Sequence, residues 1–342
     1  MESDLPMDWN LLANQPRLLL EADLKPVAGH RFQPTGFADL GAAEYELPDG
    51  TQMLLVESAQ SVANRLEKTC LQGDGPDLEP ELAGLPYVKA ELEGGPDGTI
   101  LTSSLVEAHR LASPYFLHNK AFQKMIADEM AYNPKRPLQW NKIYSTLFKY
   151  DPNCLVHGVF LSLLEGGRVR APRALSGFIE ACKVERVVSG GVKNSPVDPT
   201  GQLQVAEAEA GEKGVYSNVP YSRVEYVADN IKAYFNLDLS LIRGYGLGKD
   251  AENLLISLSL LKIRRFLSAG LRLRTACDLA MIGEVRVSAP VEFSLPVEVQ
   301  LLEAVKAGIS ACSSQFAEPP VTLLHTKVKL VKDKKAASTE SN

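Results

Sequence analysis

The sequence contains no Cys-x-x-Cys pair and no long hydrophobic run. Its longest nearly unbroken apolar stretch, residues 155–164, is too short to span a bilayer. The first residues, 1–6, lack the basic start and the apolar core of a signal peptide. Because widely spaced cysteines are typical of reduced thiols, we expect a cytoplasmic protein without a membrane contact or a disulfide framework. The five cysteines are Cys70, Cys154, Cys182, Cys277 and Cys312.

Motifs for catalysis and metal binding are also scarce. Cys154 and His157 have a metal-like spacing, but no second pair completes a set of four ligands. The histidines are scattered, and there is no Gly-x-Ser-x-Gly elbow and no cysteine with a recognisable triad neighbourhood. The sequence therefore predicts no metal, no cofactor and no enzymatic activity.

A basic excess is missing from the chain as a whole. The 342 residues are 45% hydrophobic and 23% charged, as in ordinary globular proteins, and the formal net charge of -6 argues against a nucleic-acid binder. The charge is unevenly distributed, however. Residues 1–110 contain 7 basic and 19 acidic residues, whereas the remainder contains 29 and 23. This asymmetry is compatible with one positive groove on a negative protein.

The basic residues gather in two stretches, 120–186 and 243–276, which contain 11 basic and 6 acidic residues and 7 basic and 2 acidic residues, respectively. Most of the clustered side chains are arginines, whose planar guanidinium groups suit phosphate oxygens. Solvated surface is the alternative interpretation for any one of them. The arginines are Arg168, Arg170, Arg173, Arg243, Arg264, Arg265, Arg272 and Arg274.

Hydrophobic periodicity predicts a mixed α+β fold. Alternating residues favour strands at 17–27 and 284–288, and an apolar run favours a buried strand at 155–164. Helical stripes predict helices over 56–70, 250–266 with Asp250 as N-cap, and about 297–310. Residues 189–201 have the composition of a turn. Because strands and helices alternate irregularly, we expect an antiparallel sheet with helices on one face.

A glycine-rich segment precedes the clearest helix. Gly244, Gly246 and Gly248 alternate after Arg243 and lead through Lys249 into the helix. Glycines let the backbone approach a ligand, and helix N-terminal amides attract phosphate. The spacing differs from that of a P-loop, so nucleotide hydrolysis is poorly supported, and an ordinary flexible turn is the alternative.

A second polar constellation joins the loop at 28–41 to one face of the helix at 56–70. Its residues can donate hydrogen bonds to phosphate and ribose, and Phe32 and Phe37 could stack on bases, although loop aromatics more often fill a core. Its candidate binding residues are His30, Arg31, Gln33, Ser58, Ser61, Asn64 and Arg65.

Four polar or glycine-containing segments follow one another along the chain: residues 29–37 (GHRFQPTGF), 55–67 (LVESAQSVANRLE), 188–194 (VSGGVKN, with Lys193 and Asn194) and 242–248 (IRGYGLG). In this order they resemble segments of a known family, the backbone subunit of the type I-U (also called I-G) CRISPR Cascade complex. The similarity extends over roughly positions 15 to 330, and several motifs in order are more specific than any one of them.

The resemblance implies a protein of the RAMP superfamily with a modified RNA-recognition-motif fold, related to ferredoxin-like folds, in which a palm carries a thumb. We accordingly expect one elaborated domain over 1–331, with insertions near 72–98 and 190–215, and a disordered tail over 332–342. It also implies a non-enzymatic ribonucleoprotein subunit in antiviral defence, which forms a helical oligomer along crRNA and presents it for pairing with target DNA.

The partners implied by the resemblance are crRNA, further copies of the chain in a helical filament, and other Cascade subunits. Those subunits are the large subunit and a fused guide-processing, end-capping subunit. Target DNA and a helicase-nuclease recruited to the complex complete the set. The RNA-binding positions carried over from the resemblance are those of the matching loops and helices. Arg168, Arg170 and Arg173 are further candidates because they belong to a basic cluster.

Two alternatives remain open at this point. One is a RAMP nuclease that cuts target RNA with a loop aspartate, for which Asp39 and Asp198 are the candidates. The other is a nucleotide-binding enzyme that uses the 244–249 glycine loop, which rests on one weak motif.

Overall fold

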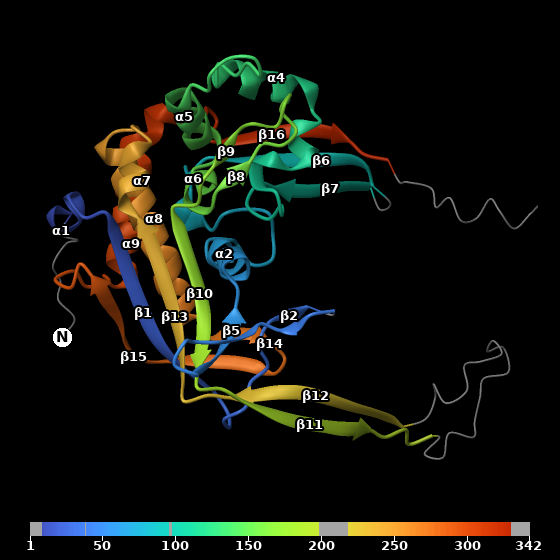
Figure 1. The fold of residues 1–342 in the computed structure, drawn as a ribbon. Coiled ribbons are helices and arrows are strands. Elements are labelled where there is room, and N and C mark those ends of the chain that lie inside the picture. The colour runs from blue at the N-terminus through green and yellow to red at the C-terminus, as the bar shows by residue number, and fades with distance from the viewer. Residues whose placement is uncertain (1–8, 38, 96–97, 198–217, 330–342) are drawn as a thin grey trace, which may run out of the picture.

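A seven-stranded antiparallel sheet organises the structure (Figure 1). The computed structural model describes residues 9–37, 39–95, 98–197 and 218–329. The strands predicted at 17–27 and 284–288 are confirmed as parts of β1 and β15. From one edge to the other the strands are β14 (Leu271–Arg274), β15 (Cys277–Ala289), β1 (Arg17–Pro26), β13 (Asn230–Asp238), β10 (Leu175–Cys182), β5 (Gln52–Glu57) and β4 (Glu44–Glu46).

Alternation of side chains decides which face of the sheet is buried. In β1 the buried residues are Leu18, Leu20, Ala22 and Leu24, and the residues between them are more exposed. β10 and β13 show the same alternation, and the three strands pair in register. Because successive strand residues point to opposite faces, one face of the sheet is apolar and must be covered.

Two helices, α2 (Ala59–Lys68) and α8 (Lys249–Ser268), cover that face, and α9 (Glu298–Cys312) packs against α8 (Figure 1). The three predicted helices and the α+β class are thus confirmed. The N-cap of α8 is Gly248, at φ 92°, and not Asp250, which lies in the first turn. A positive φ at this position favours glycine, so the backbone and not a capping side chain sets where the helix begins.

The central elements follow one another along the chain as β1, α2, β10, β13, α8 and β15. Their four strands lie side by side in the order β15-β1-β13-β10. Each helix therefore connects strands that are not consecutive neighbours in the sheet, in a β-α-β-β-α-β arrangement. β5 and β4 extend the sheet beyond β10.

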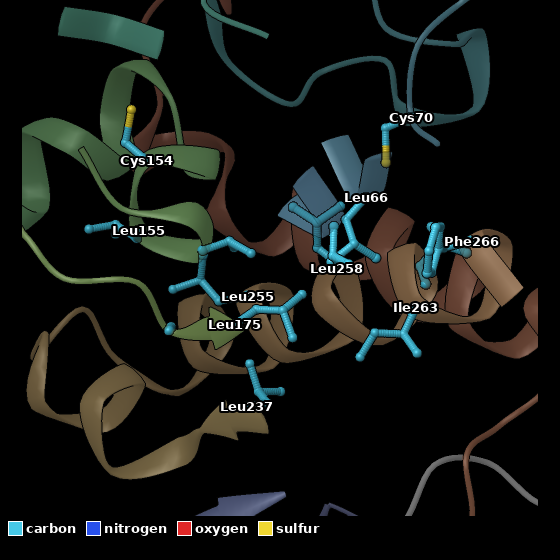
Figure 2. Close-up of a cluster of buried hydrophobic side chains, with 14 of the residues drawn as sticks. Leu66, Cys70, Cys154, Leu155, Leu175, Leu237, Leu255, Leu258, Ile263 and Phe266 are labelled. Carbon is cyan, nitrogen blue, oxygen red and sulfur yellow. The ribbon is translucent and has the colours of Figure 1, made fainter. Parts of the chain in front are cut away.

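The core lies between the sheet and the helices (Figure 2). Leu66 from α2 packs with Leu255 and Leu258 from α8, above Leu175 of β10 and Leu237 of β13. Each of these side chains is at most 1% exposed. Burial of a leucine side chain contributes about 1.5–3 kcal/mol, so this cluster fixes the helices on the sheet.

Two smaller β-structures project from this body (Figure 1). A three-stranded sheet has the order β16 (Val321–Lys327), β6 (Tyr87–Gly95) and β7 (Gly98–Ser103), with β16 parallel to β6. The hairpin of β11 (Glu185–Lys193) and β12 (Val219–Val227) follows β10 and leads into β13. Consequently, the hairpin is anchored at one end by two central strands.

The remaining elements are short and connect these parts. The helices are α1 (Asn10–Ala13), α3 (Pro114–Leu117), α4 (Lys120–Glu129), α5 (Trp140–Tyr150), α6 (Asn153–His157) and α7 (Leu239–Gly244). The short strands are β2 (Gly36–Phe37), β3 (Gly41–Ala42), β8 (Val159–Phe160) and β9 (Arg170–Ala171). The 3-10 turns are η1 (Pro80–Leu82), η2 (Arg110–Ala112) and η3 (Ser313–Gln315).

The strand predicted over 155–164 is wrong. The segment is buried as expected at most positions, but it forms the end of α6 and then the two-residue strand β8. The side chain of Asp151 accepts hydrogen bonds from the backbone and side chain of Asn153, which starts the helix, and Gly158 ends it at φ 80°. A short apolar run does not distinguish a buried strand from a buried helix.

The turn predicted over 189–201 is also wrong in its first part, because residues 189–193 belong to β11. Residues 198–201, most of the insertion expected near 190–215 and the tail at 332–342 lie outside the described residues. Of the insertion expected near 72–98, residues 87–95 form β6. Among the described helices, none is long and apolar enough to cross a membrane.

The contact between α8 and α9 yields a stability prediction. A Cβ atom at Gly308 would lie 2.9 Å from Cβ of Leu254, so Gly308→Val should overpack this contact and destabilise the fold by about 2–3 kcal/mol. Ala307→Val introduces the same side chain at the exposed neighbouring position and should cost less than about 1 kcal/mol. Urea unfolding followed by circular dichroism measures both, and equal losses would contradict the packing assignment.

Candidate functional site

The loop at 28–37 is held by backbone hydrogen bonds on three sides. Phe32 exchanges two bonds with Tyr226 of β12, at 2.9 and 2.8 Å. The Gln33 amide donates to the carbonyl oxygen of Ala276, and the Thr35 amide donates to that of Val56. Phe32 is fully buried, so the possible base-stacking role for this ring is not supported and it fills the core. The loop is therefore a fixed rim on which polar side chains are carried.

The β11–β12 hairpin faces this rim. Gly190 and Gly191 allow β12 to approach closely, because a Cβ at Gly190 would lie 2.5 Å from the Tyr221 carbonyl oxygen and one at Gly191 2.9 Å from its hydroxyl. The Tyr221 ring is 53% exposed, and the guanidinium of Arg223 lies 6.0 Å from its centroid. An exposed aromatic ring beside an arginine is thus presented on the hairpin.

Two adjoining cavities lie between the loop and the hairpin, with Arg223 lining both. The larger, of about 610 Å³, is bounded by the loop, β2 and β3, the hairpin and the turn between β14 and β15. The smaller, of about 330 Å³, lies against the 26–31 segment. We call them together the arginine groove, after its lining residues Arg31, Arg186, Arg223 and Arg274.

The charges in the arginine groove are layered. The guanidinium groups lie outward, with side-chain exposures of 56% for Arg31 and 65% for Arg186, while their carboxylate partners Glu225 and Glu44 are exposed by 6% and 30%. Glu225 also pairs with Arg223 at 3.3 Å and accepts a hydrogen bond from Ser189. Because Glu225 lies beneath and the arginines are more exposed than their partners, the surface that a ligand meets is mainly cationic. Glu44 is partly exposed beside Arg186, and Asp278 also lines the smaller cavity.

Glu44 is kept ionised under the larger cavity. Burial disfavours its charged form, but hydrogen bonds from Tyr226 and Arg186 outweigh burial and lower the pKa of the Glu44 carboxyl. Burial, followed by the interaction with Glu44, raises the pKa of Tyr226. The Tyr226 hydroxyl therefore stays a donor, and Arg186 stays paired but solvent-facing.

A buried carboxylate supports the floor of the groove. Glu57, at the end of β5 and 1% exposed, accepts hydrogen bonds from Ser61 and from the guanidinium groups of Arg65 and Arg274. Arg274 also donates to the carbonyl oxygens of Gln33 and Val56. Glu57 thus joins α2, the β14–β15 turn and the loop at 28–37.

The residues predicted from the 28–41 loop and α2 divide into two groups. His30, Arg31 and Gln33 line the arginine groove. Three others serve local structure: Ser58 caps α2, Ser61 binds Glu57, and Asn64 accepts a hydrogen bond from Gln60. Arg65 donates to Glu57 and to the carbonyl oxygens of Arg272 and Leu273. The polar face of α2 therefore carries structural hydrogen bonds.

The arginines at 168–173 lie near the other end of β10. Arg168 donates to the carbonyl oxygens of Pro134 and Arg136, and the Arg170 guanidinium lies 4.5 Å from the centroid of the Phe160 ring. Both side chains are exposed. Arg173 is bound more tightly, to the carbonyl oxygens of His157 and Ala59 and to Gln60.

The glycine segment at 244–249 lies at the opposite end of α8 from the groove. Gly248 precedes the 20-residue helix and Arg274 follows it, so they are about 30 Å apart along the helix axis. Arg243 donates to the carbonyl oxygens of Leu12 and Gln15, and Lys249 pairs with Glu252. Gly244 ends α7, and Gly246 has φ 68°. The 30–33 loop and the glycine segment therefore lie in two separate regions of the structure.

Lys193 and Asn194 lie exposed at the end of β11, far along the hairpin from its root at β10. Arg264 and Arg265, predicted as phosphate-binding groups, instead hold structural partners. Arg264 donates to the carbonyl oxygens of Leu295 and Pro296, and Arg265 bridges Glu79 and Glu298.

Sequence reasoning missed Arg186 and Arg223 as site residues. They lie on β11 and β12, whose cross-strand pairs include Arg186 with Tyr226 and Ser189 with Arg223. Enrichment in valine and tyrosine over 185–193 and 219–227 was the available signal for strands. Gly190 and Gly191 concealed it, because adjacent glycines are more typical of turns.

The residues of the alternative interpretations are placed as follows. Asp39 is exposed on the turn between β2 and β3, and Asp198 lies outside the described residues. Cys154 donates to Asp151, whereas His157 contacts the buried Lys262 at 2.9 Å, so the two have different partners. Among the described side chains, no group of three or more His, Cys, Asp or Glu could hold a metal ion.

Comparison with known proteins relates the chain to CRISPR systems. Residues 18–186 match the family model of CRISPR-associated protein GSU0053. A chain of a CRISPR RNA-guided surveillance complex in a pre-nicking state is similar with a TM-score of 0.41 and 13% identity, over 79% of this chain and 75% of that one. Csc2 of Thermofilum pendens is similar with a TM-score of 0.35 and 9% identity, over 90% of this chain and 88% of that one. No curated protein matches significantly.

The Glu57 contacts yield the prediction of this section. Glu57→Gln leaves two partly buried guanidinium groups without their counter-charge and should destabilise the fold by about 2–3 kcal/mol. Glu303→Gln makes the same change on the exposed face of α9 and should alter stability by less than about 0.5 kcal/mol. Thermal and urea unfolding measure both, and a neutral Glu57→Gln would show that the cluster does not support the floor.

Proposed function

We propose that this protein is a non-enzymatic backbone subunit of a CRISPR Cascade complex, which binds crRNA in the arginine groove. The observation that carries the proposal is the groove itself, between a hydrogen-bonded loop and a hairpin. It is lined by four arginines, three of which pair with a buried glutamate. The family match over residues 18–186 includes the 28–37 loop, β5, α2 and Arg186. Both observations support a CRISPR-associated protein that binds RNA.

Phosphate recognition follows from the geometry of the groove. Outward guanidinium groups can donate two parallel hydrogen bonds to a phosphate, and Tyr221 offers a ring beside Arg223. A surface that grips phosphate and ribose leaves the base edges free. Another RNA-guided effector divides the work in this way, with base pairing reading sequence and the protein reading backbone shape.

The proposed fold is a modified RNA-recognition motif. The order β15-β1-β13-β10, with α2 and α8 as the connecting helices, supports a ferredoxin-like palm. The β11–β12 hairpin is the proposed thumb, and the arginine groove lies where it meets the palm.

Assembly along the guide completes the proposal. Copies of the chain would stack head to tail in a helical filament on crRNA, since a repeated contact whose rotation does not close gives an open helix. The other Cascade subunits, target DNA and a recruited helicase-nuclease are proposed partners of that cytoplasmic assembly.

Substituting arginines of the groove tests directly whether RNA phosphates bind there. Arg186→Gln and Arg223→Gln should each reduce the slope of log K against log salt by about one for a labelled single-stranded RNA. Arg17→Gln is the matched control, because Arg17 is half exposed and paired with Asp238 at the opposite end of β1 from the groove. Equal salt slopes for all three variants would show that RNA does not contact the groove.

Co-expression with guide RNA tests the assembly. Assemblies much heavier than the 37.3 kDa chain, containing RNA in a ladder of sizes, are the expected result in light scattering with absorbance detection. A nucleic-acid-free monomer would contradict the proposal. Metal-dependent cutting of complementary RNA that is lost in Asp39→Ala would instead indicate a nuclease.

A further inference from the structure

A second cationic surface lies on the connection between α4 and α5. Residues 130–150 contain Lys135, Arg136, Lys142 and Lys149 and no acidic residue. Lys149 pairs with Glu129, just before this stretch. Lys135 and Arg136 are exposed, and neither takes part in an ion pair among the described residues. Two adjacent, uncompensated cations therefore face solvent.

Hydrogen bonds hold the backbone of the connection in place. The Tyr132 hydroxyl donates to the Glu165 carbonyl oxygen, and the amides of Lys135 and Arg136 donate to the side chain and backbone of Asn133. Arg168 donates to the carbonyl oxygens of Pro134 and Arg136, at 2.8 and 3.2 Å. Since the loop is ordered before any ligand arrives, binding would lose little conformational entropy.

An aromatic stack begins directly beside the loop. Trp140, the first residue of α5, is 39% exposed and stacks on Tyr144, with 5.4 Å between ring centroids and an interplanar angle of 27°. Tyr144 contacts the buried Tyr245, at 4.6 Å between centroids. The indole is thus supported from the core, and its exposed surface can accept a further flat ring.

Two exposed cations and an exposed, supported indole within six residues of one another suit one class of ligand. Phosphate groups attract Lys135 and Arg136, while bases stack on aromatic rings whatever their sequence. A double helix would offer its phosphates but not its base faces, which favours a single strand. We propose that Lys135, Arg136 and Trp140 form a second nucleic-acid-binding surface, for a single-stranded polynucleotide, either RNA or DNA.

This surface is separate from the arginine groove. Tyr245 lies just before α8 and Arg274 just after it, so the two regions are at opposite ends of a 20-residue helix, about 30 Å apart. One short strand segment does not occupy both on the same copy. The surface therefore binds its ligand whether or not the groove binds crRNA.

Tryptophan fluorescence tests the proposal, because Trp9 and Trp140 are the two tryptophans of the chain. Trp9→Phe leaves Trp140 as the reporter, and Trp140→Phe leaves Trp9 as the control. Adding oligothymidylate or oligouridylate should quench the fluorescence of the first variant by about a quarter or more and leave the second unchanged, since stacked bases quench indole. The oligonucleotide that quenches at lower concentration identifies DNA or RNA as the preferred strand.

Charge neutralisation gives an independent measure in the same Trp9→Phe background. Lys135→Gln with Arg136→Gln should weaken the quenching titration about three- to tenfold and reduce its salt slope by about two. Lys306→Gln, an exposed change on α9, should leave both unchanged. Absence of quenching by either oligonucleotide, with an unchanged circular dichroism spectrum, would overturn the proposal.

A groove variant separates this inference from the proposed function. Arg186→Gln with Arg223→Gln, in the Trp9→Phe background, should lose RNA affinity in the groove but retain the quenching of Trp140. Loss of quenching in this variant would show that Trp140 reports on ligand in the groove, which would also overturn a separate surface.

Discussion

The carboxylate of Glu57 is the interaction on which the candidate site depends. A buried carboxylate is costly unless it is fully paired, and Glu57 meets this requirement with Ser61, Arg65 and Arg274. These partners come from α2 and from a turn more than 200 residues further along the chain. Satisfying one charge therefore fixes where β5, α2 and the distant end of β14 meet. Arg274 extends the network to the carbonyl oxygen of Gln33, which fixes the rim of the groove as well.

The same arrangement explains how a negatively charged chain presents a cationic groove. Glu225 and Glu57 are buried beside the arginines that they bind, and they contribute to the net charge of -6 without facing a ligand. Counting charges along a sequence weighs both partners equally, whereas a ligand meets mainly the exposed one. The acidic residues are also needed for folding, since arginines held close together without them would repel one another.

Periodicity predicted the parts of the fold whose burial is one-sided. β1, α2 and α9 each expose one face, so the pattern was readable from the sequence. α8 is buried at every position from 254 to 263, and its length of 20 residues is what distinguishes it as a helix. The segment 155–164 was assigned wrongly because burial on all sides removes the pattern. Gly190 and Gly191 resembled a turn, although their role is to let Tyr221 approach a strand. That role depends on the partner strand, which the local sequence does not contain.

The candidate site was predictable only where its residues form a recognisable motif within one short segment. The 28–37 loop was found through its turn residues and donors, but Arg65, Arg243 and Arg264 resemble free phosphate-binding groups in the sequence and are bound to carbonyl oxygens in the structure. The sequence around an arginine does not reveal which carbonyl oxygens it will bind. Carbonyl groups that lack a backbone partner lie at the ends of helices and strands that are distant in sequence.

The two proposed surfaces have a joint consequence for an assembly. If copies repeat by one rotation and translation, the arginine grooves form one continuous track, and the Lys135–Trp140 surfaces form a second track at the other end of every α8. Both tracks repeat at the same interval because each copy contributes once to each. A second strand bound along the Lys135–Trp140 track would therefore keep a constant alignment with the strand in the grooves. The length of α8 would set the distance between the two strands at about 30 Å. The rigidity of that buried helix is what would keep the two strands apart.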